Sequence, residues 1–257
     1  MAHTITFAHF KGGTGKTTSC LSIAGFLARY GAKVLAVDLD PQANLTAGLG
    51  IDNSKLKSSM CHIMAKRKSM NDVIIETGIQ NLSLAPATPY LVHTTLRKYE
   101  TKEDAQILKK ALQSVEQDYD FILIDTPPSN GHFIVNGVTA ADSVVLVLDP
   151  GAFALQGINT FNTIFKSYCS KMGFDLNIEM ALLTKHRKSF NPFRKGAGKE
   201  IKTNAEEILG KKVFTIPLSG HIYESQKRGL PISHHRPYSG VGLAYMKVAE
   251  ELIKLKD

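Results

Sequence analysis

Short apolar runs alternate with longer segments of helical periodicity along most of the chain. The runs end in turn residues, as strands buried on both faces do. We predict strands at residues 5–9, 33–38, 81–85, 121–125, 143–148, 179–184 and 213–216, and helices at 16–30, 102–117, 155–171, 199–209 and 240–256. This alternation is typical of βαβ units. It predicts one doubly wound α/β domain over residues 1–257, with a mostly parallel, twisted sheet flanked by helices and no preceding helix-turn-helix domain.

The first predicted helix shows the pattern most clearly. Its apolar face consists of Leu21, Ile23, Ala24, Leu27 and Tyr30. Gly31 follows at the position where a glycine commonly ends a helix. The least regular segments are residues 54–76 and 185–198.

Composition sets limits on the class of protein. Hydrophobic residues make up 43% of the 257 residues and charged residues 21%, which is ordinary for a globular protein. Lys and Arg outnumber Asp and Glu by 31 to 23, so the formal net charge is +8. A positive charge of this size favours contact with a polyanion or an acidic surface, but a basic enzyme without such a partner has the same composition.

Three features indicate a cytoplasmic protein. Cys20, Cys61 and Cys169 are far apart in the sequence, which argues against a disulfide framework, a zinc ribbon or an iron–sulfur cluster. The first ten residues run directly into a glycine-rich stretch and leave no room for a signal peptide. No apolar run approaches the length of a membrane span.

The glycine-rich stretch between the first strand and the first helix has the form of a phosphate-binding loop. Its backbone N–H groups and the helix N-terminus would surround an anion, Lys16 would reach the β- and γ-phosphates, and the Thr17 hydroxyl would bind Mg²⁺. We expect nucleotide contacts from Gly12, Gly13, Thr14, Gly15, Lys16, Thr17 and Thr18. The usual first glycine of such loops is replaced by Phe10, and a second lysine follows at Lys11.

Three aspartates at strand ends are candidates for metal binding and catalysis. Asp125 ends the apolar run 121–125, where a carboxylate can hold Mg²⁺ through water. Asp38 and Asp40 end the run 33–38 and would approach the loop if strands pair in sequence order. Asp40 is the better candidate to orient an attacking water and a possible metal ligand, whereas Asp38 is a possible structural hydrogen-bond acceptor.

Five segments together resemble the ParA/Soj branch of the ParA–MinD ATPases, the deviant Walker A family of P-loop NTPases. They are KGGTGKTT (11–18), VDLDPQANLTAGLG (37–50), FILIDTPPS (121–129), FALQGI (153–158) and IPLSGHIYESQKRGLPI (216–232). The resemblance implies a weak Mg²⁺-dependent ATPase that forms an ATP-sandwich dimer, with Lys11 reaching the phosphates of the partner subunit. It also implies that Asp40 positions the hydrolytic water and that Thr17 and Asp125 serve Mg²⁺. Pro217 and Ser219 would lie beside the adenine.

The family offers several outputs for such an ATPase, and the positive charge favours DNA. The resemblance then implies plasmid or chromosome partition, in which the dimer binds DNA non-specifically and a ParB-like partner stimulates hydrolysis. The candidate DNA-binding residues are Lys185, Arg187, Lys188, Arg194, Lys195, Lys199 and Lys202, and further basic pairs stand at 211–212 and 227–228. Leu218 and His221 replace two arginines of the family. Alternatives are the positioning of a protein cargo and a MinD-like association with membranes, which the absence of an added amphipathic tail disfavours.

Overall fold

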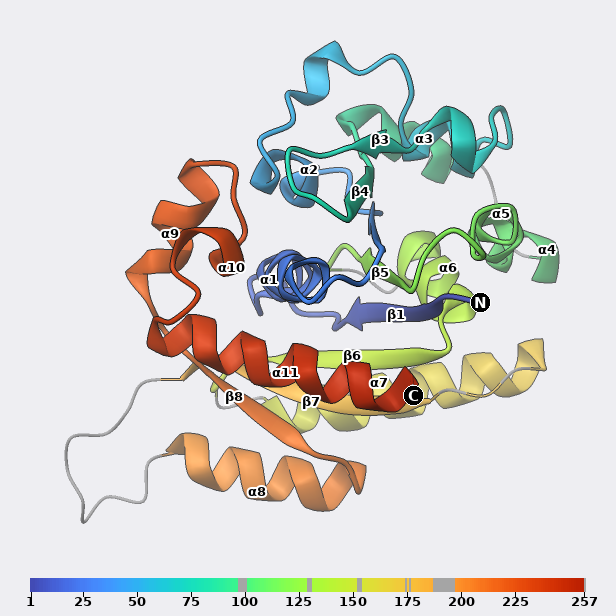
Figure 1. The fold of residues 1–257 in the computed structure, drawn as a ribbon. Helices are drawn as coiled ribbons and strands as arrows, with labels where there is room; N and C mark the ends of the chain where they lie inside the picture. Colours follow the sequence, from blue (N-terminus) through green and yellow to red (C-terminus); the bar gives the residue numbers. More distant parts are fainter. Residues whose placement is uncertain are drawn as a thin grey trace.

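A computed structural model describes residues 1–96, 101–128, 131–151, 154–173, 175, 177–186 and 197–256. These residues form an α/β fold around one eight-stranded sheet, in the order β3-β4-β2-β5-β1-β6-β7-β8. Every pairing is parallel except that of β3 with β4. Helices lie on both faces of the sheet (Figure 1). The predicted doubly wound architecture is therefore confirmed.

The strands are β1 (His3–Ala8), β2 (Val34–Asp38), β3 (Ile75–Glu76), β4 (Leu82–Ala85), β5 (Phe121–Asp125), β6 (Ser143–Leu148), β7 (Ile178–His186) and β8 (Val213–Pro217). The α-helices are α1 (Lys16–Arg29), α2 (Asn44–Gly48), α3 (Met60–Met64), α4 (Lys102–Ala105), α5 (Ile107–Leu112), α6 (His132–Ala140), α7 (Ala154–Met172), α8 (Ala197–Leu209), α9 (Gly220–Lys227), α10 (Ile232–His235) and α11 (Gly240–Lys256). Three 3₁₀ helices occur at Asn53–Lys55, Met70–Asp72 and Pro89–Leu96. No described helix is long and apolar enough to cross a membrane.

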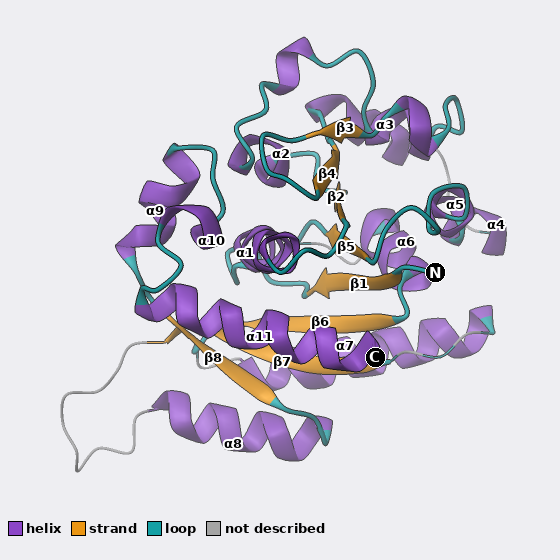
Figure 2. Ribbon diagram, in the orientation of Figure 1, coloured by secondary structure: helices purple, strands orange, loops and turns teal. Residues whose placement is uncertain are grey.

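Alternating strand residues divide the core between the two faces of the sheet. In β6, Val145 and Val147 pack with α1 and α11, whereas Val144, Leu146 and Leu148 face α7 and α8. A third cluster, formed with α3 and α5, covers the same face as α7 beside β2 and β5. Figure 2 shows α11 in front of β6 and β7, with α7 behind them. Burial of these strands on both faces explains their nearly continuous apolar sequences.

The order of the strands corrects one expectation. Sequence-order pairing placed β2 next to β1, but β5 lies between them and pairs with both. In this register Phe7, Asp125 and Asp38 stand side by side on three adjacent strands. The crossover brings the acidic end of β5 next to the phosphate loop and moves Asp38 one strand further away.

The helices missed by the sequence prediction are short. α2, α3, α6, α9 and α10 have between four and nine residues, too few for a helical period to stand out. The predicted helix at 102–117 is divided into α4 and α5, with Gln106 between them. Gly31 does follow the last turn of α1 in the left-handed region, with φ of 92°, as its sequence position predicted.

Candidate nucleotide-binding site

The loop between β1 and α1 has the backbone of a phosphate-binding loop. Gly13 (φ 72°) and Gly15 (φ 94°) both occupy the left-handed region, where a side chain would be strained. Phe10, which replaces the usual first glycine, is turned away from the loop and stacks on α7. Its ring centroid lies 5.3 Å from that of Phe161 and 5.5 Å from that of Phe165. Phe10 therefore anchors the start of the loop, and the turns are made by the glycines that follow.

The end of β7 holds the other side of the loop. The Thr184 hydroxyl donates to the carbonyl oxygen of Thr14 at 2.5 Å, and the Lys185 ammonium donates to that of Gly13 at 2.5 Å. Two consecutive side chains thus fix two consecutive carbonyls. These two bonds tie the loop to the end of β7.

A cavity of about 510 Å³ opens over this loop and the N-terminus of α1. A volume of this size is typical of a site for a small-molecule ligand. Of the residues predicted to bind nucleotide or metal, its lining includes Gly13, Gly15, Lys16, Thr17, Thr18 and Asp40. It does not include Lys11, Gly12, Thr14, Pro217, Ser219 or Asp125.

Lys16 is buried at the centre of the site. Its side chain points toward the start of the loop, where the ammonium lies 3.2 Å from the carbonyl oxygen of Lys11. Burial lowers the pKa of Lys16, and the carboxylates of Asp125 and Asp40 oppose that change. A phosphate would supply the negative charge that this desolvated ammonium favours.

Asp38 has a structural role in the folded chain. Its carboxylate accepts hydrogen bonds from the backbone N–H and the hydroxyl of Thr46, at 2.9 and 2.7 Å, and from the backbone N–H of Asp40 at 3.1 Å. Burial nevertheless raises the pKa of Asp38 to about 6. These bonds fix the turn that carries Asp40 into the cavity. The Asp40 carboxylate itself accepts from the Gln42 N–H at 2.9 Å and keeps a second oxygen available.

The Asp125 carboxylate is suited to bind a metal, because no described residue satisfies its oxygens with a hydrogen bond of normal geometry. It is fully buried, and neither carboxylate oxygen has a hydrogen bond of normal geometry, although the Thr17 hydroxyl is near enough to lower its pKa somewhat. Burial and the neighbouring Asp38 together raise the pKa of Asp125 well above its ordinary value. Within the described ranges, no three His, Cys, Asp or Glu side chains form a ready-made metal site. Mg²⁺ would therefore depend on Thr17, Asp125 and the phosphates of the nucleotide.

Lys11 lies outside the cavity and points away from it. Its ammonium contacts both oxygens of Asp149, at 2.7 and 2.9 Å. The side chain of Lys11 is 49% exposed and that of Asp149 is 24% exposed. The two lysines of the loop thus have opposite environments, since Lys16 faces its own cavity whereas Lys11 faces solvent.

The segment after β8 contributes a residue that the sequence did not single out. Ser219 caps α9, its hydroxyl accepting from the His221 N–H at 3.3 Å, and Pro217 ends β8. Gln226, the last residue but one of α9, lines the cavity and donates to the Thr18 hydroxyl at 3.2 Å. The sequence analysis also did not predict the following lining residues of the cavity: Gln42, Asn44, Ala47, Gly48, Thr126, Pro128 and Lys185, the last of which was predicted to bind DNA. Most of them belong to the segments that carry the family resemblance, which was the available signal.

The predicted DNA-binding residues are only partly described. Arg187, Lys188, Arg194 and Lys195 lie outside the described residues. Lys199 is exposed on α8, whereas Lys202 is paired with Glu206 at 2.7 Å. Lys185 is exposed as well, but its ammonium lies against the phosphate loop.

Comparisons with known proteins agree with this geometry. A family model described as an AAA domain matches residues 2–178. The sporulation initiation inhibitor protein Soj of Bacillus subtilis is 33% identical over 254 residues, and the alignment covers 98% of each chain. The chain belongs to the ParA–MinD family of P-loop ATPases. The chromosome-partitioning ATPase Soj of Treponema pallidum is also 33% identical, again over 98% of each chain.

Solved structures of the family extend the match to three dimensions. The septum site-determining protein MinD of Pyrococcus horikoshii, complexed with Mg-ADP, superposes with a TM-score of 0.81. The two chains are 26% identical, and the match covers 99% of this chain and 97% of the MinD chain. Binding of a nucleotide and Mg²⁺ is therefore known for a relative with this fold.

Proposed function

We propose that this protein is an ATP-dependent DNA-partition ATPase that works as a nucleotide-switched dimer in the cytoplasm. The observation that carries the proposal is the position of Lys11. A lysine of the phosphate loop that does not line its own cavity, is half exposed and is paired with a partly exposed carboxylate, Asp149, is available to a second subunit. Delivered to the partner's ATP, its charge would stabilise the transition state as an arginine finger does.

Within one subunit, the other groups divide the work of hydrolysis. Lys16 binds the β- and γ-phosphates, while Thr17 and, through water, Asp125 hold Mg²⁺, which neutralises charge on the phosphates. Asp40 has a free carboxylate oxygen on the cavity wall and orients the attacking water. Pro217 and Ser219, which lie at the start of the segment that brings Gln226 to the cavity, flank the adenine.

ATP would then connect the two subunits, since Lys11 of each subunit contacts the ATP that is bound to the other subunit. The ATP dimer is the state that binds DNA, and hydrolysis, stimulated by a ParB-like protein, releases it. This is a change in the populations of two states rather than metabolic turnover.

The described cations offer a DNA-binding surface next to the site. Lys227 and Arg228 at the end of α9 and Arg236 after α10 are exposed, and none of them forms an ion pair with a described residue. Together with Lys199 they are available for DNA phosphates. Such contacts do not read bases, and they predict an affinity that falls steeply with salt.

A gel-shift titration on arbitrary DNA tests the proposal. We expect binding with ATP and little binding with ADP or without nucleotide. The double variant Lys227→Glu/Arg228→Glu should weaken binding and lower the salt slope by about one for each lost phosphate contact. The control for charge is Lys109→Glu/Lys110→Glu, a double reversal at two exposed positions of α5. Equal binding or no binding in all three nucleotide states would exclude the DNA-partition function.

A second measurement tests the dimer. Lys11→Ala should bind ATP normally but fail to dimerise with it, as observed by light scattering. A Lys11→Ala protein that dimerises like the wild type would rule out the sandwich arrangement. If DNA binding is absent, liposome sedimentation and a pull-down without DNA would separate the membrane and protein-cargo alternatives.

A further inference from the structure

α9 carries an exposed tyrosine beside the cations of the proposed DNA-binding surface. Tyr223 is 70% exposed, and its ring and hydroxyl form no hydrogen bond, ring contact or cation–π contact with any described residue. Leu218, which precedes the same helix, is 50% exposed. Exposed aromatic side chains are enriched where a partner binds, because a ring offers a large contact area at a small entropic cost. The segment 218–228 thus combines apolar surface with positive charge.

The ring of Tyr223 and the ammonium of Lys227 share one face of α9. Residues four positions apart in a helix are neighbours on its surface, and both of these residues are exposed. The other face of α9 is turned inward, since Ser225 is buried and Gln226 lines the nucleotide cavity. Arg228 continues the charge at the C-terminus of the helix, where it is exposed as well. The outer surface of α9 therefore presents an aromatic ring followed by two cations.

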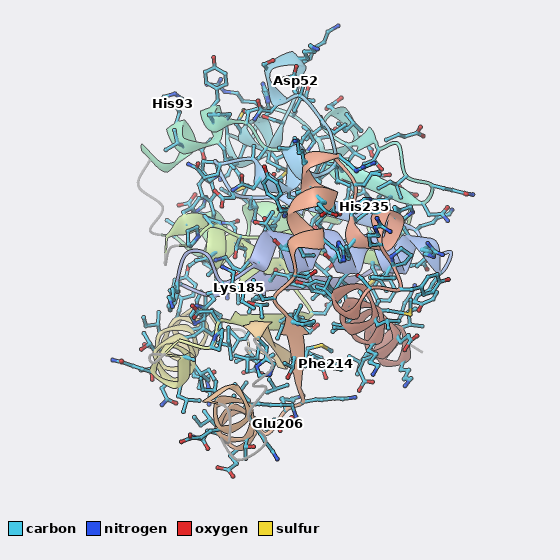
Figure 3. All side chains as sticks on the ribbon, turned by 90° about the vertical axis from the view of Figure 1, so that its left-hand side faces the viewer. Asp52, His93, Lys185, Glu206, Phe214 and His235 are labelled. Carbon is cyan, nitrogen blue, oxygen red and sulfur yellow. The ribbon has the colours of Figure 1, made fainter. Side chains whose placement is uncertain are left out.

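α10 brings a third cation to this surface. Glu224 follows Tyr223, and its carboxylate lies 3.6 Å from Nε2 of His235 in α10 and 3.3 Å from Nδ1 of His221. Arg236 comes directly after His235 and is exposed. α9 and α10 lie at the left of Figure 1, the side that is turned toward the viewer in Figure 3, where His235 is labelled. The two imidazoles hold the Glu224 carboxylate and leave the three cations without an ion-pair partner among the described residues.

The cations and the free ring select different features of a polynucleotide. Ammonium and guanidinium groups bind the phosphates of a single strand and of a duplex alike. An aromatic ring stacks on the face of a base, and within a duplex the neighbouring base pairs already cover these faces. A ring that projects into solvent beside unpaired cations therefore matches a strand whose bases are unpaired.

We propose that the outer surface of α9 and α10 binds single-stranded polynucleotide, with Tyr223 stacked on an unpaired base. Lys227, Arg228 and Arg236 bind the flanking phosphates. This inference rests on the DNA binding proposed above and specifies the form of polynucleotide that the surface prefers. Because every base has a face on which a ring can stack, binding remains independent of sequence.

Fluorescence anisotropy with two labelled probes tests this inference in the presence of ATP and Mg²⁺. The probes are a single strand of about 25 nucleotides without self-complementarity, longer than the site of one single-strand-binding domain, and the duplex formed from it. We expect the wild type to bind the strand more tightly than the duplex. Tyr223→Ala should weaken strand binding by about fivefold or more, the contribution of one stacked base, and leave duplex binding unchanged. Tyr223→Phe, which keeps the ring, should bind both probes like the wild type.

Tyr90→Ala is the matched control for the loss of an exposed tyrosine. Tyr90 is also 70% exposed, but it belongs to the 3₁₀ helix Pro89–Leu96. Figure 3 labels His93 of that helix well away from His235. Tyr90→Ala should therefore leave the affinities for both probes unchanged.

The salt dependence of binding separates the ring from the cations. A stacked base releases no counterions, whereas each neutralised phosphate does. Tyr223→Ala should keep the wild-type slope of log K against log salt while its affinity for the strand falls at every salt concentration. Lys227→Glu/Arg228→Glu should instead lower the slope for both probes. A lower slope in Tyr223→Ala would mean that the substitution displaces the cations and that the ring itself contacts no base.

The wild-type titrations separate this inference from the proposed function. If the wild type binds neither probe with ATP, the proposed function fails and this inference fails with it. If duplex binding depends on ATP but the strand is bound no more tightly, or if Tyr223→Ala weakens both probes equally, the failure concerns the stacking of Tyr223 alone. Tyr223→Ala should bind ATP with wild-type affinity in a calorimetric titration, because Tyr223 does not line the nucleotide cavity. Weaker ATP binding would assign its loss of strand binding to the nucleotide site instead.

Discussion

On the side of the phosphate loop that faces β2 and β5, the charged groups are buried. Asp38, Asp40, Asp125 and Lys16 are at most 6% exposed. Burial and neighbouring charges shift the pKa values of Asp38, Asp125 and Lys16. On the side that faces β6 and β7, Lys11 and Lys185 are exposed at the ends of long side chains. On the first side the strands fix the positions of the charged groups. On the second side, rotation of a side chain is enough for a charged group to change its partner.

This difference separates two tasks of a nucleotide switch. Groups that act on phosphate and metal gain from fixed positions in a site with little water, because electrostatic interactions are stronger there. Groups that report the nucleotide to another subunit must be able to change partners. Substitutions on the buried side should therefore affect nucleotide binding, chemistry or folding, and those on the exposed side should affect the association of two subunits.

The largest effect is expected at the buried lysine. Lys16→Ala should lose measurable nucleotide binding, a weakening of about 100-fold or more, because a desolvated charge-assisted contact to phosphate disappears. Calorimetric titration with ATP measures it, and Lys11→Ala, at the other lysine of the same loop, should keep wild-type affinity. Binding by Lys16→Ala within tenfold of the wild type would place the phosphates elsewhere.

Loss of Asp40, the carboxylate proposed to position water, should slow chemistry without affecting assembly. Asp40→Ala should bind ATP and dimerise, but kcat should fall by a factor of about 10² to 10⁴, the usual contribution of a positioned base. Phosphate release under saturating ATP measures kcat, and light scattering confirms the dimer. Normal turnover would assign the water to another group.

The buried carboxylate of β5 should reduce stability in the absence of metal. A carboxyl whose pKa is raised on folding binds more protons folded than unfolded, so the free energy of unfolding decreases as pH rises from about 4 through the folded pKa. Asp125→Asn removes this cost, and we expect it to exceed wild-type stability at about pH 8 by about 1–3 kcal/mol. The difference should vanish near pH 4.

The quantity to compare is the difference in the free energy of unfolding between Asp125→Asn and the wild type at each pH. His9 and His132 have pKa values lowered to about 4, chiefly by burial, so they make both proteins less stable as pH falls below the ordinary histidine value. Urea unfolding of the two proteins at each pH cancels that contribution. Saturating Mg²⁺ and ATP should stabilise the wild type more than Asp125→Asn, and an equal gain would remove Asp125 from the metal site.

The smallest effect is expected on the exposed side. Asp149→Asn removes the surface ion pair of Lys11, which is worth at most about 1 kcal/mol. It should therefore strengthen ATP-dependent dimerisation by up to about fivefold, as measured by sedimentation at low salt. The gain should shrink at high salt because screening already weakens the pair in the wild type. Weaker dimerisation of Asp149→Asn would mean that Asp149 itself contacts the partner subunit.

Local patterns predicted the strand and the loop backbone on the buried side of the site. The run 121–125 has the same bounds as β5, and Gly13 and Gly15 of the glycine-rich loop have left-handed conformations. A buried parallel strand leaves a long apolar signature, and a phosphate loop is a contiguous motif. Both signals are therefore present within a few residues of sequence.

The exposed side could not be predicted in the same way. Lys185 follows the predicted strand 179–184 but lies within β7, and the bulge that turns its side chain toward the loop leaves no local pattern in the sequence. The insertion of β5 between β1 and β2 is likewise invisible to local patterns, because it depends on which apolar edges meet in the folded sheet. Side-chain direction and strand order both arise from long-range packing.

The stacking of Phe10 on α7 has a mechanical consequence. A loop clamped by aromatic rings at one end has a fixed pivot, and Lys11 is the first residue beyond it. Rotation about the side-chain bonds of Lys11 can then move its ammonium from Asp149 toward a neighbouring molecule without a movement of β1. Phe10 thus holds the backbone in place beside Lys11, so that a change of partner requires only rotation of the lysine side chain.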